Sequence, residues 1–152
     1  RFYPVLLAAY EAGIDRETRL YPGAAEAVEA LRRAGYATGI CTNKPVGLAE
    51  LLVRRLGVRD LFASLVGADT LPVRKPDPAP YHLSVSKAGG VTERSILIGD
   101  TDTDPKTATA AGGPSVLITF GPEGAGIARL EPDALLEAYA DLPALADRFL
   151  PA

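Results

Sequence analysis

The feature that most constrains the fold of this chain is the spacing of its apolar runs. Four short runs, most of them with β-branched residues, have the character of buried strands, and a shorter run is expected to form a fifth strand at a sheet edge. These five runs are residues 37–42, 63–68, 95–100, 114–120 and 133–138.

The segments between these runs have the spacing of amphipathic helices, with proline near the start or glycine after the end. They are residues 22–35, 46–57, 77–90 and 104–113. Alternation of strands and helices predicts an α/β fold with a doubly wound, Rossmann-like parallel sheet. In such a sheet, ligands bind beyond the carboxyl ends of the strands.

Composition limits the kind of partner. The chain has 152 residues, a net charge of −3 and no marked run of Lys or Arg, which argues against nucleic acid and anionic membranes as partners. No apolar segment is long enough to span a bilayer. The single cysteine, Cys41, excludes an internal disulfide and is typical of a reducing compartment, so we expect a cytoplasmic protein.

An acidic loop follows the run at 95–100, where Asp100, Asp102 and Asp104 alternate. A calcium loop of the EF-hand kind is excluded, because its sixth position requires Gly and its twelfth Glu, whereas this chain has Pro105 and Ala111. Asp100 and Asp104 can instead converge on Mg²⁺, which binds through one or two carboxylates, waters and substrate phosphate. The alternative is that Asp100 begins a turn and Asp104 caps the next helix.

Two other predicted strand ends carry groups that can bind phosphate. Thr42 and Asn43 lie just before a helix, where a hydroxyl and free backbone N–H groups can hold phosphate oxygens. Lys75 lies in a proline-rich segment that would hold its ammonium as a fixed point charge. Taken singly, these residues could equally be an ordinary helix cap and a solvated surface lysine.

Together the motifs resemble the haloacid dehalogenase superfamily of hydrolases, most closely its phosphoglycolate phosphatase-like branch. The resemblance covers residues 18–145 and rests on "YPGAAEAVEALRRAGY", "CTNKP", "RKPDPAPY" and "IGDTDTDPKTATAAG". It implies that Thr42 and Asn43 bind a phosphoryl oxygen, and that Lys75 binds phosphate and steadies the nucleophile. It also implies that Asp100 is a direct Mg²⁺ ligand, and that Asp104 completes the metal site directly or through water.

The family's first motif, Asp-x-Asp-Gly-Thr, does not occur in the chain. The resemblance places the nucleophilic Asp on a central strand, which we expect upstream of residue 1. Residues 1–18 are expected to be the tail of an amphipathic helix from a helical cap domain, and residues 19–152 the α/β core without its first strand. Removal of that strand would leave a gap of roughly 10 Å with unpaired backbone groups, so these 152 residues alone are expected to be inactive.

The favoured function is a Mg²⁺-dependent phosphomonoester hydrolase that works through an aspartyl-phosphate. The expected partner is a small phosphorylated metabolite, with 2-phosphoglycolate as the first candidate. A sugar phosphomutase of the same superfamily is one alternative. A receiver-like or non-catalytic phosphate-binding module is another, although receivers carry their acidic pair first in the chain and here the acids come last.

Overall fold

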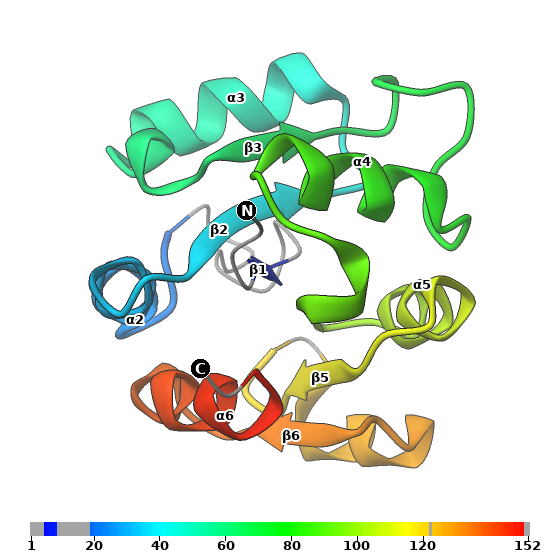
Figure 1. Ribbon diagram of the computed structural model, residues 1–152. Coiled ribbons are helices and arrows are strands. Elements are labelled where there is room, and N and C mark those ends of the chain that lie inside the picture. Colours follow the sequence, from blue (N-terminus) through cyan, green and yellow to red (C-terminus); the bar gives the residue numbers. More distant parts are fainter. Residues whose placement is uncertain (1–4, 9–18, 122, 151–152) are drawn as a thin grey trace.

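The structure is a computed structural model that describes residues 5–8, 19–121 and 123–150. Its centre is a six-stranded sheet in the order β3-β2-β1-β4-β5-β6, in which all neighbouring strands are parallel (Figure 1). The strands are β1 (Val5–Ala8), β2 (Ala37–Cys41), β3 (Ser64–Val66), β4 (Ser95–Gly99), β5 (Ser115–Ile118) and β6 (Ala134–Leu136). The predicted α/β fold with a doubly wound parallel sheet is confirmed, and so are the five predicted strands, with β6 at the edge.

The helices cover both faces of the sheet (Figure 1). The α-helices are α2 (Ala24–Arg33), α3 (Val46–Arg55), α4 (Ala79–Lys87), α5 (Thr103–Ala111) and α6 (Leu142–Phe149). The short 3-10 helices are η1 (Arg59–Leu61), η2 (Thr92–Arg94), η3 (Gly124–Leu130) and η4 (Tyr139–Asp141). The helices α2, α3 and α4 lie within predicted segments, and α5 begins one residue before its segment, whereas α6 was not anticipated. No helix in the described ranges has the length and apolar character needed to cross a membrane.

The core is divided by the sheet, because successive side chains of a strand point to opposite faces. In β4, Ile96 and Ile98 pack with residues of α2 and α6, whereas Leu97 packs with residues of α4 and α5. The three side chains are fully buried. Burial of each contributes about 1.5–3 kcal/mol, so this strand anchors both layers of helices and fixes where its carboxyl end lies.

The structure differs from the sequence-based expectation at residues 5–8. These residues form β1 in the middle of the sheet, where Ala8 pairs with Ile40 of β2 and Ile98 of β4. The prediction of a helical tail is therefore wrong for Val5–Ala8, which occupy the central place in the sheet here. The physical reason is that the strands on either side offer unpaired backbone groups, which an apolar segment can satisfy by becoming a strand. The prediction that the α/β core takes its central strand from an upstream segment stays a prediction. The rest of the proposed cap tail, residues 1–4 and 9–18, lies outside the described residues, so the assignment of 1–18 to a cap domain stays a prediction.

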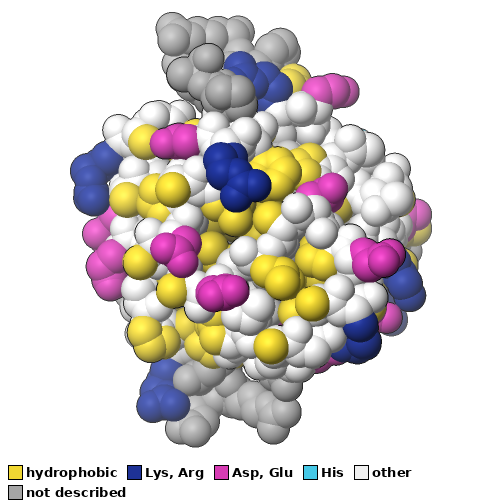
Figure 2. Space-filling view, turned by 90° about the horizontal axis from the view of Figure 1, so that it is seen from below, with side chains coloured by type: hydrophobic (Ala, Val, Ile, Leu, Met, Phe, Trp, Pro, Cys, Tyr) yellow, Lys and Arg dark blue, Asp and Glu magenta, His cyan; other side chains and the backbone are white. Residues whose placement is uncertain are grey.

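The surface beyond β6 is chemically mixed. Figure 2 shows hydrophobic side chains interrupted by acidic and basic ones over this face. Leu135 of β6 is among the exposed large hydrophobic residues. Scattered exposed apolar groups of this kind are normal for a folded surface.

The buried tyrosines predict how stability depends on alkaline pH. Tyr36 Oη donates a hydrogen bond of 2.6 Å to Asp147 Oδ1. Burial, followed by the hydrogen bond and charge of Asp147, raises the pKa of Tyr36 from 10.0 to about 12. The folded chain therefore keeps a proton that the unfolded chain loses between these values, so stability is complete below pH 10 and falls as the pH rises toward about 12.

We expect the Tyr36 contribution to fall by about 1.4 kcal/mol per pH unit across that window. Urea unfolding of the wild type and of Tyr36→Phe at about pH 9, 10 and 11 measures it. The decrease of stability with pH should be shallower in the variant, because it lacks Tyr36. It should not vanish, because Tyr81 and Tyr139 remain and burial raises their pKa as well. Equal slopes in the two proteins would contradict the assignment.

Candidate active site

The carboxyl ends of the central strands bring the predicted site residues to one edge of the sheet. Thr42 directly follows β2, and Asp100 directly follows β4. Since β1 lies between these strands, the two residues stand two strand spacings apart, about 10 Å. Both are almost completely buried, with 1% of Thr42 and 2% of Asp100 exposed.

A buried ion pair joins the long loop after β3 to the first turn of α5. Lys75 Nζ lies 2.7 Å from Asp104 Oδ1, and their side chains are only 4% and 2% exposed. The other carboxylate oxygen, Asp104 Oδ2, accepts hydrogen bonds from the backbone N–H groups of Asp100 at 3.1 Å and Thr101 at 3.4 Å. Asp104 thus ties Lys75 to the start of the acidic loop, and a buried charge pair is stable only when it is hydrogen-bonded in this way.

Asp104 lies directly over the last residue of β4, Gly99. A Cβ atom added to Gly99 would come closer than 3.0 Å to the Cβ, Cγ and Oδ2 atoms of Asp104. Glycine is therefore required here by the close approach of a carboxylate to the backbone. Sequence analysis gave Gly99 no role, although a glycine at the end of a buried strand signals such an approach.

Asn43 holds the backbone of Lys75 from the neighbouring loop. Its side-chain Nδ2 donates to Lys75 O at 3.0 Å, and Lys75 N donates to Asn43 Oδ1 at 3.1 Å. This reciprocal pair fixes the residue from which the buried ammonium extends. Asn43 therefore positions Lys75, in addition to the phosphate-binding role that stays a prediction.

Two further hydrogen bonds join the loop after β3 to the segment around the start of α3. Asp69 Oδ1 accepts a hydrogen bond from Val46 N at 2.7 Å, and Ala68 N donates to Lys44 O at 2.8 Å. A Cβ atom on Gly67 would come closer than 3.0 Å to backbone atoms of Val46 and Lys44. The N–H group of Val46, the first residue of α3, is thus used by Asp69, a residue to which sequence analysis gave no role.

On the other side of Asp100 lies an aromatic cluster of Tyr21, Phe120 and Tyr139. Phe120 makes edge-to-face contacts with both tyrosines, each with ring centroids 5.3 Å apart. The residue after Phe120, Gly121, lies against Asp100, because an added Cβ would be 3.4 Å from the Asp100 Cβ. Burial, and then the charge of Asp100 and the nearby Tyr21, raise the pKa of Tyr139 far above its ordinary value. Nothing in the sequence distinguishes this tyrosine from an ordinary core aromatic.

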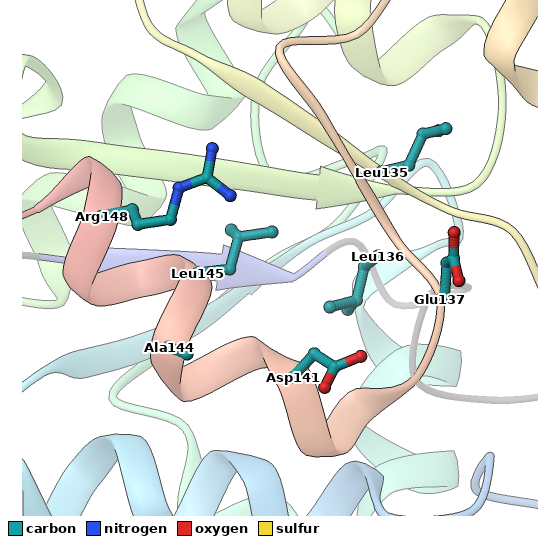
Figure 3. Close-up of a pocket in the computed structure, with 7 residues that line it drawn as sticks. All are labelled: Leu135, Leu136, Glu137, Asp141, Ala144, Leu145 and Arg148. Atoms are coloured by element: carbon teal, nitrogen blue, oxygen red, sulfur yellow. The ribbon is translucent and has the colours of Figure 1, made fainter.

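The pockets that the structure shows elsewhere do not contain these residues. A hollow of about 260 Å³ lies between β6 and α6, and charged as well as leucine side chains line it (Figure 3), namely Leu135, Leu136, Glu137, Asp141, Leu145 and Arg148. A second, of about 540 Å³, lies beside α5 and includes Asp102 and Lys106. Thr42, Lys75, Asp100 and Asp104 line neither of them.

The donor set fits Mg²⁺ in a limited way. Within the described ranges, no group of three or more His, Cys, Asp or Glu side chains is gathered so that it could hold a metal ion. Asp100, however, directly follows β4, and the second carboxylate nearby, that of Asp104 in the first turn of α5, is already neutralised by Lys75. One or two carboxylates suffice for Mg²⁺, which takes its other ligands from water and substrate phosphate.

The fold and the site define a doubly wound α/β domain with an acid–lysine cluster at the carboxyl edge of its sheet. The family model for haloacid dehalogenase-like hydrolases matches residues 4–112. The chain belongs to this family of hydrolases.

The names of similar proteins are more specific than the name of the family. The chain is 38% identical over 149 residues to a phosphoglycolate phosphatase of Agrobacterium fabrum, covering 97% of this chain and 64% of the relative. A phosphoglycolate phosphatase of Cereibacter sphaeroides (strain ATCC 17029 / ATH 2.4.9) is 39% identical over 145 residues, with 95% and 65% covered. The crystal structure of a predicted phosphoglycolate phosphatase from Haemophilus somnus 129PT superposes with a TM-score of 0.76 at 32% identity, covering 84% of this chain and 57% of that one. The chain thus spans somewhat less than two thirds of the length of these relatives.

The contact between Gly99 and Asp104 leads to a test of how the acidic loop is held. We expect Gly99→Ala to destabilise the protein by about 1–3 kcal/mol, since the new methyl group displaces the Asp104 carboxylate. Gly47→Ala is the matched control, because no atom lies within 4 Å of its added Cβ and it belongs to α3. The control should be neutral or stabilising by up to about 1 kcal/mol in urea unfolding. An equally harmless Gly99→Ala would contradict the observed packing.

Proposed function

We propose that the chain is the core of a Mg²⁺-dependent phosphomonoester hydrolase that acts on 2-phosphoglycolate or a similar small phosphomonoester. The observation that carries this proposal is the buried Lys75–Asp104 pair, held by Asn43 beside Asp100 at the carboxyl edge of the sheet. A positive charge fixed next to a carboxylate site is suited to a phosphoryl group that bridges a cation and an ammonium. The name of the relatives supports the substrate.

Each site residue has a proposed task. Thr42, with Asn43, donates hydrogen bonds to a phosphoryl oxygen. Lys75 binds a second phosphoryl oxygen and steadies the nucleophile, while Asp104 keeps its ammonium in place. Asp100 would hold Mg²⁺ directly. Asp104 would contact the cation through a water molecule, since both Asp104 oxygens already accept hydrogen bonds. When bound, the cation supplies positive charge that offsets the charge of the transferred phosphoryl group.

The nucleophile is proposed to be an Asp upstream of residue 1, which would form an aspartyl-phosphate that water then hydrolyses. Its strand would take the place between β2 and β4 that β1 occupies here. Such a strand would replace β1 and leave residues 1–18 to the proposed cap. The proposed partner is a small phosphorylated metabolite, and the cytoplasm remains the expected compartment.

A phosphatase assay of the protein that contains these residues tests the proposal. We expect hydrolysis of small phosphomonoesters with Mg²⁺ and its loss on chelation. Lys75→Met and Asp100→Asn should lower kcat/KM by about 100-fold or more, because each removes charge that faces the phosphoryl group. Lys106→Met is the matched control, since Lys106 pairs with Asp102 at 3.4 Å on the exposed surface of α5.

Thermal unfolding of the variants separates lost function from lost folding. Loss of Lys75 leaves a buried carboxylate, which costs about 3–5 kcal/mol, so activity is compared where each variant is folded. Turnover that is unaffected by chelation would refute the metal requirement. Wild-type rates in folded Lys75→Met would refute the role of the ion pair.

A further inference from the structure

The hydroxyl of Tyr139 stands out among the polar groups near the site. It is the one buried side-chain nitrogen or oxygen atom within the described residues that has no hydrogen-bond partner. Tyr139 itself is only 3% exposed. Leaving such a group unsatisfied costs about 1–3 kcal/mol, so a buried orphan hydroxyl calls for a partner that the protein atoms do not supply.

The surroundings restrict what this partner can be. The Tyr139 ring is held by Phe120 at a centroid distance of 5.3 Å, and its Cβ lies 3.5 Å from the position of a Cβ on Gly23. The segment that carries Phe120 lies against Asp100 through Gly121. After burial, the charge of the Asp100 carboxylate does most to raise the pKa of the Tyr139 hydroxyl. A fixed phenol beside a carboxylate suits a small polar species that contacts both, such as an ordered water.

We propose that Tyr139 is a positioning residue for the divalent cation at Asp100, and that its hydroxyl holds a water molecule of the cation's hydration shell. Mg²⁺ usually keeps several waters in proteins, and partners that orient the ligands of a metal affect how tightly it binds. This inference rests on the proposed function only in requiring a cation at Asp100. Packing of the aromatic ring accounts for an aromatic residue at this position but not for its hydroxyl, and the proposal gives the hydroxyl a function.

Two variants test the proposal through metal binding and stability, with no need for turnover. Tyr139→Phe keeps the ring and removes the orphan hydroxyl. Tyr81→Phe is the matched control, because Tyr81 of α4 is also fully buried but its hydroxyl is hydrogen-bonded to Ser95 Oγ at 2.5 Å, at the opposite end of β4 from Asp100. Electron paramagnetic resonance of free Mn²⁺ measures affinity, and thermal unfolding with and without Mg²⁺ measures stability.

The two variants should behave in opposite ways. Tyr139→Phe should be at least as stable as the wild type without metal, but bind Mn²⁺ about three- to tenfold more weakly and gain less stability from Mg²⁺. Tyr81→Phe should lose stability without metal and keep the wild-type affinity for Mn²⁺. Asp100→Asn should abolish binding and locate the ion.

Three results would overturn the proposal. One is unchanged Mn²⁺ affinity in Tyr139→Phe, another is a loss of metal-free stability as large as in Tyr81→Phe, and the third is a wild type that binds no Mn²⁺. If the predicted opposite behaviour is found while no phosphomonoester is hydrolysed, the proposed function fails but the role of Tyr139 stands.

Discussion

The structure of the site depends on one interaction, the buried ion pair of Lys75 and Asp104. Two charges can be withdrawn from water together only if they are paired in good geometry and held by further hydrogen bonds, which the surrounding residues supply. Backbone N–H groups at the start of the acidic loop satisfy one oxygen of Asp104, and Asn43 fixes the backbone of Lys75. Gly99 leaves the space in which the carboxylate lies. The repulsion expected from three acids at alternate positions is thereby reduced, because one is neutralised by Lys75 and Asp102 is paired with Lys106 on the surface.

Local periodicity was sufficient to predict most of the fold. Each of the five predicted strands is a short apolar run. The first four helices have proline or glycine at their ends, and α2 and α3 also have an apolar stripe, so neighbouring residues determine their form. The approximate place of Thr42, Lys75 and Asp100 was also predictable, because parallel strands present their carboxyl ends at the same edge. What periodicity could not provide was the network between these loops. The contacts of Asn43 with Lys75 and of Asp69 with Val46 join residues 32 and 23 positions apart, and no pattern within a single loop encodes them.

The error at Val5–Ala8 has a different origin. The segment "VLLA" is compatible with a helix or a buried strand, since short apolar runs carry no decisive period. The outcome depends on what the rest of the chain leaves unsatisfied, namely the facing backbone groups of β2 and β4. Parallel pairing with both strands satisfies these groups, which a helix could not do. Tyr139 was missed for a related reason, because its ring has the burial of any core aromatic and only the missing partner of its hydroxyl distinguishes it.

The same central place in the sheet determines whether the site contains a reacting group. A strand between β2 and β4 that ends level with Cys41 and Gly99 puts its next residue about 5 Å from each of the strands that lead to Thr42 and Asp100. Among the strands of the described residues, only β1 neighbours both β2 and β4, so only this place lets one side chain face Thr42 and Asp100 together. Val5–Ala8 completes the hydrogen bonding of the sheet there but contains no carboxylate, hydroxyl or thiol. The central strand therefore has two separate tasks, which are to complete the sheet and to supply a nucleophile. An apolar segment is sufficient for the first task but not for the second.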